Sequence, residues 1–165
     1  MTPAPETLFF KKSHFVTHLP VQFRYSRSHF WSQKREGSRL RLGFTKFATR
    51  MLGEIVDYNF DTLSGAPVSP GQVLGWVEGF KAISDVISIG QGSFVGANQA
   101  LQEDSELITR APYAEGWLYE MDGQLDDQTL DVQGYVAHLN VTLDRLQEKN
   151  SADDKLPNSP QPDSL

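Results

Sequence analysis

The stretch QVLGWVEGFKAISDVISI, residues 72–89, decides the fold class of this chain. Within it, residues 72–78 and 83–89 both carry the short apolar runs that strands favour. Only the four residues Gly79–Ala82 separate these runs, which is the spacing of a tight β hairpin. The stretch therefore predicts an antiparallel hairpin with Lys81 at its tip.

The predicted hairpin also places two carboxylates beside the lysine. A two-residue turn would pair Glu78 with Ile83, and one step further along it would pair Trp76 with Asp85. Because strand side chains alternate between faces, Glu78 and Asp85 would share one face. A lysine presented in this way, among small residues and carboxylates, suits a modifying enzyme. The alternative is an ordinary solvated lysine, since lysines are mostly exposed.

The rest of the chain is rich in short strand-like segments. We predict strands at 21–31, 38–44, 54–60, 93–97 and 117–121. A short helix is expected near 45–52, with Thr45 as its N-cap and Gly53 as its C-cap. Residues 130–148 space their apolar side chains as an amphipathic helix does. The chain is therefore predicted to be mainly β, an antiparallel sandwich or barrel with two added helices.

The two ends of the chain differ from this central part. Residues 1–20 contain three prolines and are expected to form an extended arm. Residues 150–165 contain three further prolines and no aromatic residue, which predicts a disordered tail. The folded domain is accordingly expected to span residues 21–149.

Composition excludes several classes of protein. The chain has 165 residues, of which 39% are hydrophobic and 22% charged, and it contains no cysteine. Disulfides, thiolate metal sites and cysteine nucleophiles are therefore excluded. No apolar run approaches the roughly 20 residues that a membrane span needs, and no secretory signal pattern opens the sequence. We expect a cytoplasmic, monomeric protein without a membrane partner.

Charge is divided unevenly along the chain. The net charge is −6, yet residues 1–50 hold ten Lys and Arg and only two Glu. This balance disfavours nucleic-acid binding. The basic region either lies against the acidic remainder or forms a docking surface, and we favour the first interpretation. Between residues 51 and 109 the only basic residue is Lys81.

Metal binding and independent catalysis find little support in the sequence. His14 and His18 have a spacing that can bind a metal on a helix, but no third ligand lies near them and the segment is not convincingly helical. No nucleophile motif is present. We therefore predict neither a metal site nor an enzyme.

Five blocks of sequence carry a family resemblance. They are Tyr25–Trp31, Gly43–Val56, Val77–Asp85 (VEGFKAISD), Asn98–Leu101 and Pro112–Leu118. In this order and spacing they resemble the glycine cleavage system H protein family over about residues 25–120. The resemblance implies a barrel-sandwich hybrid of two small antiparallel sheets, the fold of lipoyl and biotinyl carriers.

The resemblance also implies a cofactor and its site. Lipoate would be joined in amide linkage to Lys81, while Glu78 and Asp85 would help the lipoylating enzyme to recognise it. That enzyme would be a lipoate ligase or a lipoyl/octanoyl transferase, and dihydrolipoyl dehydrogenase would be a further partner. The protein would be a non-catalytic carrier whose arm takes a substrate-derived group between enzymes.

Two segments bear on the pathway. The run Gly79–Asp85 and the helix start Gly134–Val136 look more similar to H-protein-like lipoate-binding proteins of bacterial sulfur oxidation. Those proteins work with a heterodisulfide-reductase-like complex, and we lean to that pathway. The alternative is the H protein of the glycine cleavage system, which carries the aminomethyl group between glycine decarboxylase and aminomethyltransferase.

Two other functions remain as alternatives. A biotinyl carrier would use a similar hairpin, but such carriers favour methionines beside the lysine, whereas Phe80 and Ala82 stand here. An unmodified scaffold would keep the fold and bind a partner through the basic N-terminal region.

Overall fold

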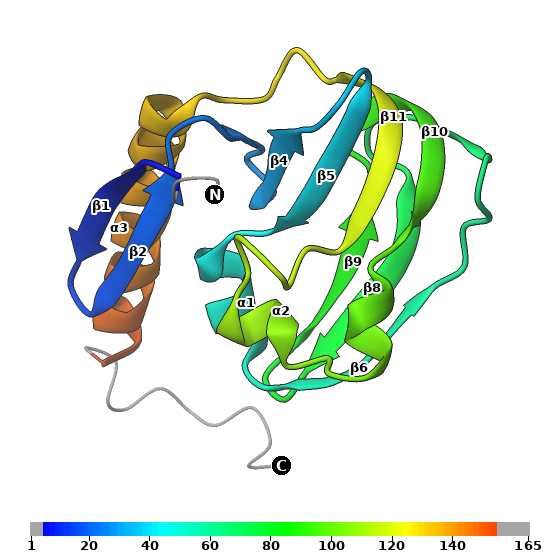
Figure 1. Ribbon diagram of the computed structural model, residues 1–165. Helices are drawn as coiled ribbons and strands as arrows, with labels where there is room; N and C mark the ends of the chain where they lie inside the picture. The colour runs from blue at the N-terminus through cyan, green and yellow to red at the C-terminus, as the bar shows by residue number, and fades with distance from the viewer. Residues whose placement is uncertain (1–4, 155–165) are drawn as a thin grey trace.

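The computed structural model describes residues 5–154, and β strands dominate it. The strands form three sheets, all with antiparallel pairing. The largest sheet has the order β3-β4-β5-β11-β10-β7, formed by Arg24–Tyr25, Phe30–Lys34, Arg39–Phe44, Tyr119–Leu125, Gly90–Ala97 and Pro67–Val68. The second sheet has the order β6-β8-β9, formed by Ile55–Phe60, Val73–Gly79 and Ile83–Ile87. The third is a two-stranded hairpin (Figure 1).

The six-stranded and three-stranded sheets enclose the main hydrophobic core. Strands of both sheets supply its fully buried side chains, among them Leu42, Leu74, Val77, Val86 and Met121. In β5 and β11 alternate residues point into this core, namely Leu40, Leu42 and Phe44, and Tyr119 and Met121, as expected where two sheets pack face to face. The predicted fold class, a mainly β barrel-sandwich of antiparallel sheets with a few helices, is confirmed.

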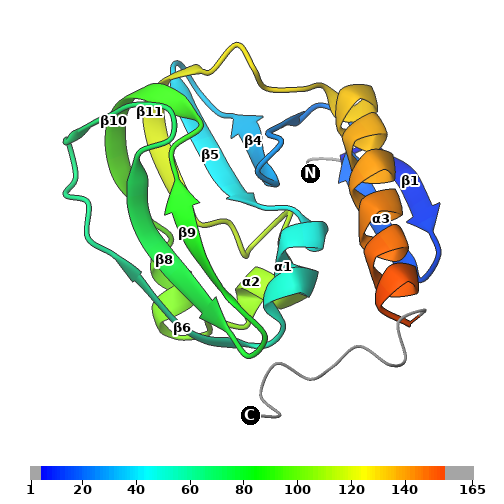
Figure 2. The same ribbon diagram turned by 180° about the vertical axis from the view of Figure 1, so that it is seen from behind.

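The hairpin over residues 72–89 has the predicted register. In β8 and β9, Glu78 lies opposite Ile83 and Trp76 lies opposite Asp85. The Gly79 N–H donates to the Ala82 carbonyl oxygen over 2.8 Å and closes a turn formed by Phe80 and Lys81. The hairpin supplies two of the three strands of its sheet, and its tip lies at the end of the sheet that is near α1 (Figure 2).

The helices lie near their predicted places, with one difference in capping. Helix α1 spans Lys46–Leu52, and the N–H of Gly53 (φ 78°) closes its last turn on Thr49. Thr45 precedes the helix, but its side chain makes no capping hydrogen bond. Its hydroxyl instead pairs with the Tyr135 hydroxyl at 2.7 Å. A buried tertiary contact has replaced the expected local one.

The remaining helices are a 3₁₀ turn and two α-helices. Their bounds are η1 Gln99–Gln102, α2 Leu107–Arg110 and α3 Val132–Asp154. Helix α3 is the predicted C-terminal helix, and it continues past residue 150, where the disordered tail was expected to begin. The rest of that predicted tail, residues 155–165, lies outside the described residues. No helix within residues 5–154 has the length and apolar character needed to cross a bilayer.

The N-terminal region differs from the predicted extended arm. Strands β1 (Thr7–Lys12) and β2 (Phe15–Pro20) pair as a hairpin that packs beside α3 (Figures 1 and 2). Together with α3 and the inner face of α1 they form a second core, whose members include Phe10, Leu19, Phe47, Tyr135 and Leu139. The local sequence indicated an arm because most of the surface that buries these apolar residues comes from α1 and α3, which lie far along the chain.

Candidate functional site

The tip of the β8–β9 hairpin is held against the corner between α1 and β6. The N–H of Lys81 donates to the Leu52 carbonyl oxygen over 2.8 Å. The N–H of Phe80 donates to the Glu54 carbonyl oxygen over 2.7 Å. These two bonds fasten the turn to a second element, so the backbone that carries Lys81 is fixed rather than free. Its side chain is exposed.

Two glycines make this close approach possible. A Cβ added to Gly79 would lie 2.1 Å from the Leu52 carbonyl oxygen, far inside van der Waals contact. Gly53 has a φ of +78°, which favours glycine, and a Cβ there would meet the Lys81 Cγ at 3.0 Å. The stem of the lysine therefore runs along the α1 corner before its amine reaches solvent.

The three residues that the sequence singled out lie on the same hairpin, Lys81 in its turn and Glu78 and Asp85 in its two strands. Glu78 and Asp85 share the outer face of the three-stranded sheet with Trp76, as their registers require. Glu78 is half-buried and Asp85 is exposed. Among the described residues, none of the ion pairs involves these two carboxylates or Lys81. The amine therefore stands clear of any carboxylate that would hold it.

Sequence reasoning gave no role to two residues at this tip, Asp57 and Phe80. Asp57 of β6 lies opposite Glu78, so two acidic residues face each other across neighbouring strands. Phe80 is 84% exposed, although it is a large aromatic residue. The alternation of strand residues could have predicted the face of Asp57, but only once the pairing of β6 with β8 was known. The exposure of Phe80 could have been inferred from its place in the turn.

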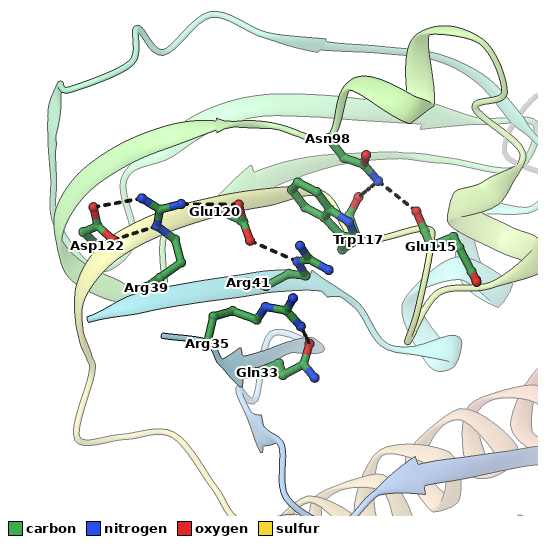
Figure 3. A network of polar contacts seen from close by, with 9 residues as sticks. All are labelled: Gln33, Arg35, Arg39, Arg41, Asn98, Glu115, Trp117, Glu120 and Asp122. Carbon is green, nitrogen blue, oxygen red and sulfur yellow. Dashed lines mark hydrogen bonds and ion pairs between the residues drawn. The ribbon is translucent and has the colours of Figure 1, made fainter. Parts of the chain in front are cut away.

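Two basic residues of the N-terminal region, Arg39 and Arg41, form ion pairs with acidic residues of the main sheet. Arg41 of β5 donates to Glu120 of β11 over 3.0 Å, and Arg39 donates to Asp122 over 2.7 Å (Figure 3). The Arg41 guanidinium also lies 4.4 Å from the centroid of the Trp117 ring. These pairs favour the interpretation that the basic strands lie against the acidic part of the chain.

The histidine pair that sequence spacing raised is not on a helix. His14 lies in the β1–β2 turn, and His18 lies in β2 with its ring 5.2 Å from that of Phe9. Within residues 5–154, no group of three or more His, Asp or Glu side chains is placed to hold a metal ion.

A third histidine is part of the contact between the main sheet and α3. The Nδ1 atom of His29 lies 2.8 Å from the Tyr135 hydroxyl, and the His29 ring packs at 4.4 Å from that of Phe47. Burial, together with the neighbouring His138, lowers the pKa of His29 to about 4. His29 therefore supports the packing of α3 as a neutral ring.

The small antiparallel sandwich, with an exposed lysine at a hairpin tip, has the fold of the lipoyl-carrier class of proteins. Comparison with known families identifies the family: the model of the family described as "Glycine cleavage H-protein" matches residues 23–143. The chain belongs to the glycine cleavage H-protein family, whose members are non-catalytic lipoyl carriers. The β1–β2 hairpin precedes the matched region.

Individual relatives agree with this family. The glycine cleavage system H protein of Corynebacterium jeikeium is 36% identical over 125 residues, which cover 74% of this chain and 98% of that protein. The H protein of Bacteroides fragilis is 37% identical over 125 residues, with the same coverage. A crystal structure of the H protein from Mycobacterium marinum superposes with a TM-score of 0.67 at 29% identity, covering 74% of this chain and 99% of that one.

These relatives change the choice between the two pathways. Each of them is named as an H protein of the glycine cleavage system. They give no support to the sulfur-oxidation branch to which the sequence had leaned. The glycine cleavage alternative is therefore the better interpretation.

Proposed function

We propose that Lys81 carries lipoate in amide linkage and that this arm serves the glycine cleavage reactions. The observation that carries the proposal is the presentation of Lys81. Its side chain is exposed, and its backbone is hydrogen-bonded to Leu52. It is also the only basic residue between positions 51 and 109, so a modifying enzyme meets no competing amine in that part of the chain.

Attachment requires acyl transfer to the Lys81 amine. The nitrogen attacks the carbonyl carbon of an activated acyl donor, either an acyl adenylate or a thioester. The new C–N bond forms while the bond to the leaving group breaks, and the nitrogen loses a proton. An exposed amine that pairs with no carboxylate of residues 5–154 fits this reaction, because no such pair has to be broken before the attack.

The protein's part is to present the arm rather than to perform chemistry. When bound, lipoate would supply a dithiolane that can be opened by reduction and can hold a substrate-derived group. A long arm tethered to a fixed backbone keeps that group at high effective concentration beside a docked enzyme. The chain has no cysteine, so no thiol of its own can exchange with the arm.

The proposed partners follow from the family. A lipoate ligase or a lipoyl/octanoyl transferase would load Lys81, with Glu78 and Asp85 as recognition residues on the flanking face. Glycine decarboxylase, aminomethyltransferase and dihydrolipoyl dehydrogenase would then act on the arm. The acidic outer face formed by Asp57, Glu78 and Asp85 suits partners with basic docking surfaces, because complementary charge steers encounter.

Intact-mass measurement after incubation with lipoate, ATP and a lipoate ligase tests the attachment. We expect a single lipoyl adduct on the unaltered protein and none on Lys81→Arg, which keeps the charge at the tip. An adduct that persists in Lys81→Arg, or none on the unaltered protein, would contradict the proposal.

The pathway has a separate test. Lipoylated protein added to glycine decarboxylase should support exchange between glycine and bicarbonate, and unlipoylated protein should not. If the lipoylated protein does not support this exchange, the glycine cleavage assignment is wrong. Lipoate on Lys81 would stand in that case, and a heterodisulfide-reductase-like complex would be the next partner to assay.

A further inference from the structure

Phe80 is the most exposed large apolar side chain among the described residues, at 84%. The turn enforces this exposure. Its own N–H is bonded to Glu54, and the next N–H is bonded to Leu52. These bonds fix the backbone that carries the ring, and the side of the turn that faces Leu52 is occupied by the α1 corner. The ring is therefore held in solvent beside the lysine.

Phe80 also has apolar neighbours at the same end of the sheet. Ile83 is 65% exposed and follows the turn in β9, where it pairs with Glu78. Val56 is 57% exposed and lies at the irregularity in β6, next to the Ile55–Gly79 pair. Isolated exposed apolar residues are common, but three at the same end of one sheet indicate a contact surface.

We infer that the enzyme that acylates Lys81 binds the hairpin tip mainly through Phe80, with Ile83 and Val56 adding to the contact. The inference rests on the proposed function of Lys81. It names a specificity residue that acts through contact with the partner, not by touching the reacting atoms.

The geometry selects the acylating enzyme among the partners. That enzyme must bring the Lys81 amine itself to an acyl carbonyl, so the residue before the lysine necessarily enters its active-site mouth. An enzyme that works on the far end of a long attached arm has no such need. Three acidic residues, Glu54, Asp57 and Glu78, lie around this apolar patch. Charge complementarity then requires basic residues around the apolar pocket of the enzyme that receives Phe80.

The test compares Phe80→Ala with Phe80→Leu and with Leu63→Ala. Leu63 is 78% exposed and lies three residues beyond the end of β6, away from the tip, so it is a matched control for losing an exposed apolar side chain. The measurement is the initial rate of lipoyl adduct formation by intact mass, at several concentrations of the unlipoylated protein, with lipoate ligase, lipoate and ATP.

We expect Phe80→Ala to lower kcat/KM for acylation about tenfold or more, mostly through KM, as loss of an interface anchor does. Phe80→Leu should recover most of that loss, and Leu63→Ala should match the unaltered protein. Thermal unfolding should be unchanged in all three variants, because the ring buries little surface.

Each other outcome has a distinct meaning. Equal acylation of Phe80→Ala and the unaltered protein would overturn the inference and leave lipoate on Lys81 intact. If Phe80→Ala is acylated normally but then slows the glycine–bicarbonate exchange, the anchor belongs to a downstream enzyme and the inference is wrong. If the unaltered protein takes no lipoate at all, the proposed function fails, and the inference fails with it.

Discussion

Gly79 and Leu52 lie in backbone contact, and this contact holds the lysine hairpin against the end of α1. A Cβ on Gly79 would sit 2.1 Å from the Leu52 carbonyl oxygen and 2.8 Å from its Cβ. The same carbonyl oxygen accepts the Lys81 N–H. The absence of a side chain at Gly79 therefore lets the turn approach the Leu52 carbonyl group, which fixes the backbone of Lys81.

Gly79→Ala should move the tip away from α1. The added methyl group meets backbone, which cannot step aside, so we expect a loss of about 1–3 kcal/mol in the free energy of unfolding. Urea unfolding measures it, and slower acylation of Lys81 should accompany it. Gly96→Ala is the matched control, since no atom lies within 4 Å of a Cβ at Gly96 and little change is expected. Equal effects of the two changes would contradict the assigned role of Gly79.

Much of this site could be predicted from the sequence because it depends on local periodicity. Alternation and turn length were enough to give the register of β8 and β9 and the shared face of Glu78 and Asp85. The attachment of the turn to Leu52 and Glu54 could not be predicted in this way. It depends on how the α1 corner packs against the sheet, and backbone carbonyl groups carry no sequence signal.

The N-terminal hairpin shows the same limit on a larger scale. Strands β1 and β2 bury Phe10 and Leu19 against α3, and Lys12 pairs with Asp144 over 2.8 Å. The two strands pair with each other, but the helices that cover their apolar face lie far along the chain, so the local pattern showed mainly prolines and charges. A hydrophobic face can be assigned to a core only when the element that covers it is known.

Leu19→Ala tests whether this hairpin is part of the fold or a loose arm. Leu19 is fully buried, so removing most of its side chain should cost about 2–5 kcal/mol of unfolding free energy. Leu63→Ala removes the same atoms from an exposed site and should change stability little. Chemical denaturation followed by circular dichroism compares them. A Leu19→Ala protein as stable as the Leu63→Ala protein would mean that the hairpin is not docked in solution.

Glu120→Gln tests the polar network of Figure 3. The Glu120 side chain is only 16% exposed and lies within ion-pair distance of Arg39 and Arg41. Losing its charge should cost about 1 kcal/mol of unfolding free energy, because a poorly solvated acceptor between two cations is replaced by a neutral one. Asp104→Asn, which alters an exposed pair with Arg110, should cost less. Equal losses in thermal or urea unfolding would show that burial does not strengthen the Glu120 contacts.

The buried His29 predicts how stability depends on pH. Burial lowers the pKa of His29 from 6.5 to about 4, so the folded protein keeps the ring neutral while the unfolded chain takes up a proton near pH 6.5. Stability from this group is therefore complete above about pH 6.5 and is lost as the pH falls toward 4. The expected loss is on the order of 2 kcal/mol.

His29→Asn should remove this part of the pH dependence. Asparagine tolerates the positive φ of 71° at this position, and it does not titrate. Urea unfolding at pH 7 and at pH 4.5 should show a smaller difference for His29→Asn than for the unaltered protein. His14→Asn, in the exposed β1–β2 turn, should keep the full difference. If the two variants lose stability equally between these pH values, His29 is not the group that couples protonation to the packing of α3.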